Sequence, residues 1–166
     1  MQIVGDRLSE LARTEKKGDQ VDAFARSAFN RYYYAAFLTT REMLRTLNTN
    51  WTRTPHAAIP ELLNGQVFAR IKMETSRQWK SGELTRKKSI QMKTEAKQAA
   101  AKLADLLRIA NHIRVVADYL PEEELLWDGD TFKLSGQTIS AASRWSRYAS
   151  MHAGILLKVW RNLGLS

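Results

Sequence analysis

Apolar residues recur every three or four positions along most of the chain, which is the spacing of one face of an α-helix. The clearest stripe lies in a long helix predicted to end near Leu47; its members are Val21, Phe24, Ala28, Tyr32, Ala36, Met43 and Leu47. At its centre Tyr32, Tyr33 and Tyr34 point about 100° apart and cannot all be buried alike. We expect Tyr34 to carry its hydroxyl to the surface or to a pocket. The alternative is that all three rings fill a helical core.

The same spacing predicts three further helices. A short helix covers residues 6–13 and ends at Lys16-Lys17-Gly18, and Asp19 is a plausible N-cap for the long helix that follows. A second long helix covers residues 89–119 and is stopped by Pro121. The last helix begins near Thr138 or Ser140 and ends at Gly164.

The segments between these helices are shorter or polar. We expect a loop at residues 48–54. A short helix is expected at 60–63, with its end at Asn64-Gly65, and residues 67–74 are expected to add one or two helical turns. Asp128-Gly129, between two short apolar runs in 125–134, is a hairpin signal. The sequence therefore predicts an all-α fold: one domain over residues 1–166, a bundle of about five helices with a small β-hairpin before the last.

Charge and composition narrow the function classes. The 166 residues include 26 lysines and arginines against 17 acidic residues, a net charge of +9 that favours a polyanionic partner. The chain has no cysteine, which excludes disulfides and thiolate metal sites and favours a reducing cytoplasm. No apolar run is long enough to span a bilayer and the N-terminus lacks the pattern of a signal peptide, so we expect a cytoplasmic protein without a membrane partner.

A basic stretch between Gln66 and Lys102 holds ten lysines and arginines against three glutamates. One interpretation is a phosphate-contacting RNA surface, because cations gain by releasing the counterions condensed on a polyanion. The other is a solvated, partly mobile connection between helices. An isolated tryptophan favours the binding surface, since an indole can stack on a base. The predicted RNA-binding residues are Arg70, Lys72, Arg77, Trp79, Lys80, Arg86, Lys87 and Lys88.

Arg114 and Asp118 lie four positions apart and therefore share one helix face. The basic-then-acidic order is the weaker one for a helix pair, and a negative charge in the last turn is disfavoured by the helix dipole. Local helix energetics thus do not explain the pair. A tertiary role, in orienting a partner or in forming a polar site, is favoured over an incidental surface pair.

His152 falls on the apolar stripe of the last helix. A buried, hydrogen-bonded histidine is the default interpretation. The alternative is that His152 and an arginine upstream cleave RNA, because an imidazole moves protons near neutral pH and a guanidinium stabilises the phosphorane. Glu122-Glu123-Glu124 is read as a solvated turn, since adjacent carboxylates point in different directions. We expect no metal and no cofactor.

Two motifs together resemble a known family. Asn30-Arg-Tyr-Tyr-Tyr-Ala-Ala-Phe37 is similar to the tyrosine-rich second helix of HEPN domains (higher eukaryotes and prokaryotes nucleotide-binding). Arg114-Val-Val-Ala-Asp-Tyr119 is similar to the Arg-x-x-Ala-Asp-Tyr signature of small bacterial members. The resemblance covers nearly the whole chain. It implies a dimerising helical bundle, often a ribonuclease toxin or antiphage effector, or a partner of a nucleotidyltransferase-like protein.

The RNase members of that family carry an arginine, four to six residues, then a histidine, and Arg147-Tyr-Ala-Ser-Met-His152 resembles this pattern. In an unbroken helix the two side chains are about 140° apart, so they converge only if the helix is distorted or if two chains complete the site. The first hypothesis is accordingly a metal-independent ribonuclease of a toxin–antitoxin or antiphage system, active as a homodimer. The second is a non-catalytic module that binds a partner protein, such as an antitoxin, or a nucleotide or RNA. A DNA-binding protein ranks last, because the sequence lacks a helix-turn-helix spacing.

In the second hypothesis the binding site is polar. The residues predicted to form it, or to bind the partner, are Arg31, Tyr34, Arg114, Asp118 and Tyr119.

Overall fold

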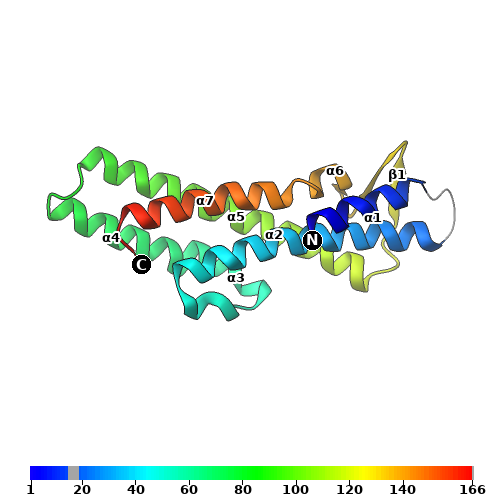
Figure 1. Cartoon of the computed structure of the whole chain (residues 1–166), viewed down its shortest axis with the longest axis horizontal. Coiled ribbons are helices and arrows are strands. Elements are labelled where there is room, and N and C mark those ends of the chain that lie inside the picture. Colours follow the sequence, from blue (N-terminus) through cyan, green and yellow to red (C-terminus); the bar gives the residue numbers. More distant parts are fainter. Residues whose placement is uncertain (15–18, 166) are drawn as a thin grey trace. The chain divides into compact units, whose positions relative to one another are not determined.

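The computed structural model describes residues 1–14 and 19–165, and most of them are helical. Short helices α3 (Ile59–Leu62) and α6 (Ile139–Ala142) and a small sheet accompany five longer helices (Figure 1). The predicted all-α bundle with a β-hairpin before the last helix is confirmed. In the described ranges, no helix is both long and apolar enough to cross a membrane. The longer helices are α1 (Gln2–Thr14), α2 (Asp19–Leu47), α4 (Phe68–Lys80), α5 (Arg86–Tyr119) and α7 (Trp145–Asn162).

The described residues group into two compact units. Unit 1 comprises Met1–Leu38 and Arg108–Tyr148, and unit 2 comprises Thr39–Leu107 and Ala149–Ser166. Helices α2, α5 and α7 each contribute residues to both units. The single domain over residues 1–166 stays a prediction. The helix end predicted at Lys16-Lys17-Gly18 lies outside the described residues.

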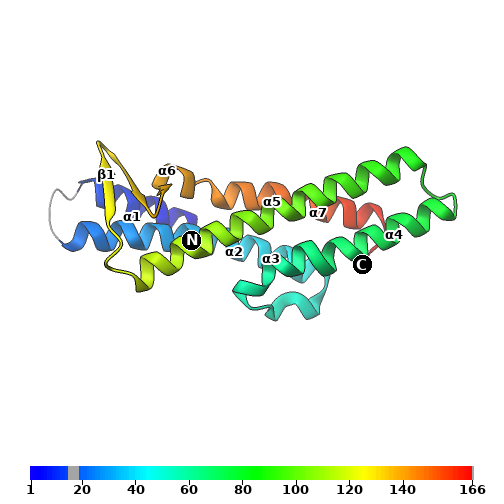
Figure 2. The same cartoon turned by 180° about the vertical axis from the view of Figure 1, so that it is seen from behind.

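A three-stranded antiparallel sheet belongs to unit 1 (Figure 2). Strands β1 (Leu125–Asp128) and β2 (Thr131–Leu134) form the hairpin predicted at Asp128-Gly129. Strand β3 (Gln137–Thr138) was not predicted; it follows a turn in which Ser135 and Gly136 have φ of 44° and 80°, the left-handed values that two-residue hairpin turns require. Phe132 of β2 packs edge-on against Phe29 of α2, with ring centroids 5.9 Å apart, and so ties the sheet to the helices of unit 1.

Gly5 allows α1 to lie close to α2. A Cβ atom at this position would be 2.7 Å from Cε1 of Tyr32 and 2.8 Å from its Cδ1. Tyr32 is itself buried, and its hydroxyl donates a hydrogen bond to Asp6 Oδ1 at 2.9 Å. The missing side chain of Gly5 thus makes room for the tyrosine ring.

Arg26 of α2 caps the C-terminal end of α5 from within unit 1. Its guanidinium donates to the main-chain oxygens of Leu120 (3.1 Å) and Pro121 (3.3 Å), and also to that of Glu123. Its Nε lies 2.6 Å from Asp22 Oδ2, one turn earlier in α2. This buried side chain therefore supplies donors to main-chain oxygens just beyond α5, and the Leu120 oxygen also accepts from the Glu123 main-chain nitrogen at 3.2 Å.

In unit 2, helices α4 and α5 run antiparallel and are joined by a short turn (Figure 1). The helix end predicted at Asn64-Gly65 is wrong, because residues Leu63–Val67 form a π-helical turn that leads into α4. Leu63 and Val67 are fully buried, and their packing outweighs the weak helix propensity of Asn and Gly. Helix α4 therefore extends well beyond the one or two turns predicted for residues 67–74.

The prediction of one continuous last helix is also wrong. Thr138 caps the short α6 by accepting a hydrogen bond from the Ala141 main-chain nitrogen, as its sequence position indicated. The helix then breaks at Ser143 and Arg144 before α7 begins. Gln2 Nε2 donates to the freed Ser143 carbonyl at 3.0 Å, so a side chain of α1 stabilises the break. The predicted helix end at Gly164, where φ is 66°, is confirmed.

Candidate functional site

The predicted catalytic pair, Arg147 and His152, lies on α7. Arg147 is exposed and belongs to unit 1, whereas His152 belongs to unit 2 and is only 7% exposed. Five positions along a helix separate two side chains by about 140°, so α7 does not present them on one face. Joint action of the two residues stays a prediction, and it requires more than a single copy of this helix.

His152 has neighbours that favour the neutral imidazole. It lines a cavity of about 110 Å³ together with residues of α5, among them Glu95 and Lys102. Burial lowers the pKa of His152, and the positive charge of Lys102 lowers it further. The buried Nδ1 atom has no hydrogen-bond partner among the described residues. The sequence-based default of a hydrogen-bonded histidine therefore does not describe this nitrogen.

The lowered pKa predicts a loss of stability in acid. The unfolded chain binds a proton at His152 near the ordinary value of about 6.5, before the folded chain does, so protonation favours unfolding as pH falls below that value. We expect the urea midpoint to fall between pH 7.5 and pH 5, and His152→Gln to reduce this pH dependence. His112→Gln, which alters an exposed histidine, serves as the control. An unchanged pH dependence in His152→Gln would contradict the prediction.

Three of the five predicted polar-site residues come together near the end of α5. The Arg114 Nε atom is 2.9 Å from Asp118 Oδ2, and the guanidinium carbon of Arg114 lies 5.3 Å from the ring centroid of Tyr119. The other oxygen of Asp118 accepts a hydrogen bond from Asn30 Nδ2 of α2 at 2.5 Å. Asp118 is thus bonded to a second helix, which is the kind of tertiary contact that its unfavourable place in the last turn suggested.

Tyr34 is close enough to this cluster to influence the pKa of Arg114. Burial by itself lowers the pKa of Arg114, but Asp118, Tyr34 and Tyr119 together raise it above its usual value. Burial and the neighbouring Tyr34 raise the pKa of Tyr33 to about 12, although Arg114 opposes this shift. Tyr34 is only half-buried while Tyr32 and Tyr33 are buried, as predicted. Arg31 lies apart, its Nη1 atom 4.0 Å from Met1 Sδ.

The predicted RNA-binding residues divide into two groups. Arg77 forms ion pairs with Glu74 at 2.7 Å and Glu83 at 3.2 Å, and Arg70 lines a separate pocket beside Trp160. The others are exposed and, in the described part of the chain, have no acidic partner. Lys72 is one of them. The rest flank the turn between α4 and α5 and are called the basic hairpin here: Trp79, Lys80, Arg86, Lys87 and Lys88.

The turn of the basic hairpin is short and internally bonded. Only residues 81–85 lie between α4 and α5, so the longer mobile connection considered from the sequence is not observed. The Ser81 hydroxyl donates to Glu83 Oε1 at 2.5 Å, and the Leu84 main-chain nitrogen donates to the Gln78 carbonyl at 3.0 Å. Thr85 accepts a hydrogen bond from the Lys88 main-chain nitrogen and caps α5.

Comparison of the chain with protein-family models, with curated proteins and with solved structures finds no match. The resemblance to HEPN domains therefore stands on the two sequence motifs and on the predicted arginine and histidine alone. Within residues 1–14 and 19–165, no group of three or more histidine, aspartate or glutamate side chains is placed to hold a metal ion.

Three residues that contact the candidate sites had no role predicted from the sequence. Asn30 stands in the tyrosine-rich motif, and its position there was the only signal for a role. Glu95 and Lys102 were counted within the basic stretch, and nothing in their spacing connected them with His152. Helix periodicity assigns a residue to a face but does not say which helix that face meets.

Proposed function

We propose that this protein is a HEPN-like RNA-binding protein that acts as a metal-independent ribonuclease effector of a bacterial toxin–antitoxin or antiphage defence system. The proposal assigns RNA binding to the basic hairpin and proton transfer to His152. An antitoxin would neutralise such an effector in the cytoplasm.

The proposed RNA binding is supported mainly by the three cations in the first turn of α5. Arg86, Lys87 and Lys88 are consecutive, exposed, and without an acidic residue in the same turn. Cations at a helix N-terminus oppose the helix dipole, and these three also repel one another, so they do not serve the stability of α5. An anionic partner would remove both costs. Trp79, 43% exposed across the turn, adds an indole face on which a base can stack.

The catalytic part uses an imidazole that is neutral near pH 7. In RNA cleavage the 2′-oxygen attacks the adjacent phosphorus while its proton passes to a base, here His152, and the bond from phosphorus to the 5′-oxygen breaks. The products are a 2′,3′-cyclic phosphate and a 5′-hydroxyl, which takes up a proton. A guanidinium stabilises the extra negative charge on the phosphorane oxygens. Because of the angular separation on α7, this role falls to Arg147 of the partner subunit in a homodimer.

A second candidate function is a non-catalytic module that binds a partner protein, a nucleotide or RNA. Two observations favour it. His152 is 7% exposed, so RNA reaches it only if α5 and α7 separate locally. The second observation is a polar cluster that holds no catalytic nucleophile next to a general base; it consists of Asn30, Arg114, Asp118 and Tyr119. Such a cluster is suited to recognising a partner, for example a nucleotidyltransferase-like protein.

The proposed function is tested by RNA cleavage with the purified chain in excess EDTA. We expect cleavage by the parent and by the control His112→Ala, and none by His152→Ala or Arg147→Ala. If the site is shared between subunits, an equal mixture of the two inactive variants recovers about one quarter of the parent's activity, because half of the dimers are mixed and each has one intact site. Circular dichroism establishes that each variant is folded.

Three outcomes would contradict parts of the proposal. Absence of cleavage by the folded parent, with RNA binding retained, would favour the non-catalytic module. Cleavage that survives in His152→Ala would remove this histidine from the mechanism. Activity of a proven monomer would contradict the shared site.

A further inference from the structure

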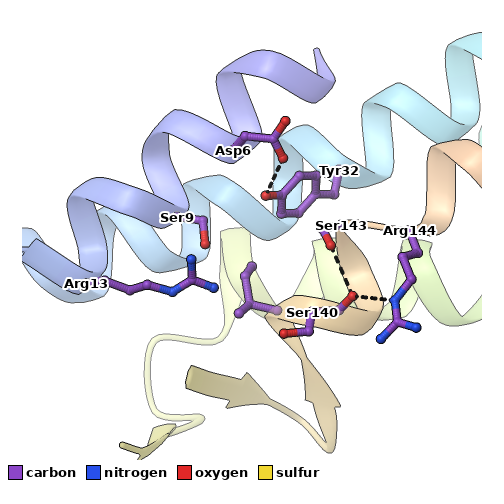
Figure 3. A pocket seen from close by; sticks show the side chains of 8 residues that line it. Asp6, Ser9, Arg13, Tyr32, Ser140, Ser143 and Arg144 are labelled. Atoms are coloured by element: carbon purple, nitrogen blue, oxygen red, sulfur yellow. Dashed lines mark hydrogen bonds between the residues drawn. The ribbon is translucent and has the colours of Figure 1, made fainter. Parts of the chain in front are cut away.

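Unit 1 contains a polar pocket of about 320 Å³ that includes none of the predicted site residues. Figure 3 shows Arg13 reaching it from α1 and Arg144 from the break between α6 and α7, with Ser140 between them in this view. Its volume equals that of about ten water molecules at roughly 30 Å³ each, which is at the lower end for small-ligand sites. The lining residues are Asp6, Ser9, Arg13, Tyr32, Ile139, Ser140, Ser143 and Arg144.

The two arginines are held in place by their Nε atoms. Arg13 Nε donates to the Asp130 carbonyl at 3.0 Å, and Arg144 Nε donates to the Ser140 carbonyl at 3.0 Å. In the described part of the chain, neither guanidinium forms an ion pair, and the Nη atoms of both have no partner. Each side chain therefore has its Nε bonded to a main-chain oxygen and its Nη donors available, and this bond reduces the entropy lost when an oxyanion binds.

The other polar groups of the pocket are suited to a ligand that carries hydroxyls as well as negative charge. Asp6 Oδ1 accepts hydrogen bonds from Tyr32 at 2.9 Å and from Gln2 at 3.1 Å, and a ligand hydroxyl could donate to this carboxylate as well. The Ser9 hydroxyl is buried in the wall. Two arginines against one aspartate leave the pocket with a formal charge of +1, which favours an anion.

We propose that this pocket binds the phosphate group of a small hydroxyl-bearing phosphate ester, or phosphate itself. A phosphate monoester carries up to two negative charges against one on a carboxylate, and it has three acceptor oxygens for a guanidinium fork and the neighbouring hydroxyls. A pocket volume of ten water molecules leaves room for a few atoms beyond the phosphate. This inference is independent of the RNA site, since it uses neither the basic hairpin nor His152.

The test is calorimetric titration of the full chain with ribose 5-phosphate, inorganic phosphate and ribose. We expect ribose 5-phosphate to bind and ribose not to bind. Arg13→Gln and Arg144→Gln should each weaken binding about tenfold or more, because each removes one charged fork. Arg7→Gln, an exposed arginine of the same helix that pairs with Glu10, should leave the affinity unchanged. Both pocket arginines are exposed, and thermal unfolding verifies that the variants are folded.

The titrations distinguish the possible occupants. Equal affinity for ribose 5-phosphate and inorganic phosphate would assign the pocket to the free anion, whereas tighter binding of the ester assigns it to the organic phosphate. No binding of either phosphate at about 10 mM, a level that detects even millimolar affinity, would overturn the proposal. Binding that survives in both arginine variants but disappears when Arg86, Lys87 and Lys88 become glutamine would also overturn it, because the phosphate would then be bound at the basic hairpin.

Discussion

Arg26→Ala is expected to lower the free energy of unfolding by about 3 kcal/mol, since it removes a buried side chain together with its hydrogen bonds to three main-chain oxygens. For a chain of this length that loss corresponds to a fall of roughly 6–12 °C in the melting temperature. Arg26 is 8% exposed, and its guanidinium donates to the oxygens of Leu120, Pro121 and Glu123 beyond the last turn of α5. Differential scanning calorimetry measures the change.

Two further variants test the cause of this effect. Arg26→Lys should also be destabilising, because an ammonium group lacks the planar fork that reaches three oxygens at once. Arg45→Ala, which alters an exposed arginine of the same helix paired with Glu42, should leave the melting temperature almost unchanged. If Arg26→Ala melts within about 1 °C of the parent, water replaces the guanidinium without a loss of stability, and the proposed capping role of Arg26 is wrong.

Replacing Arg86, Lys87 and Lys88 together by glutamine is expected to weaken binding of a single-stranded RNA oligonucleotide about 100-fold at 0.1 M salt. Each phosphate contact contributes about 0.7 to the slope of log affinity against log salt for single strands, so three contacts change that slope by about 2. The loss should therefore shrink as the salt concentration approaches 1 M. Fluorescence anisotropy over a range of salt concentrations measures both quantities.

The control for this variant removes the same number of charges from unit 1. Arg7, Arg108 and Lys133 changed to glutamine lower the net charge equally, and RNA binding should respond far less than in the hairpin variant. A matching loss in both variants would mean that RNA responds to overall charge, not to the basic hairpin. A Trp79→Ala change should add a loss of about 1–3 kcal/mol that does not depend on salt, since stacking involves no counterion release.

Most of the helices could be predicted from the sequence because their signals are local. The end of the long helix near Leu47, the stop before Pro121 and the Asp128-Gly129 hairpin depend on residues within a few positions of one another. The errors arose where packing outweighed such signals. Asn64-Gly65 reads as a helix end, yet the buried neighbours Leu63 and Val67 keep the chain helical.

For the candidate sites, the sequence predicted contacts within one helix but not contacts between helices. Arg114, Asp118 and Tyr119 are four and one positions apart, so their clustering follows from helix geometry. The bond from Asn30 to Asp118 joins residues 88 positions apart, and that from Arg26 to Glu123 joins residues 97 positions apart. Periodicity contains no information about such pairs, because it defines which face of a helix is apolar and not which helix covers it.

The sequence by itself determined the helical class, the places of most helix ends, the net charge of +9 and the run of cations at residues 86–88. Only the tertiary structure decided that those cations and Trp79 are exposed on the two sides of one short turn, that His152 is enclosed by residues of α5, and that Arg13 and Arg144 line one pocket. The physical reason is that helix formation depends on hydrogen bonds and side-chain spacing over three or four residues. A pocket instead depends on the packing of segments more than a hundred residues apart in the chain.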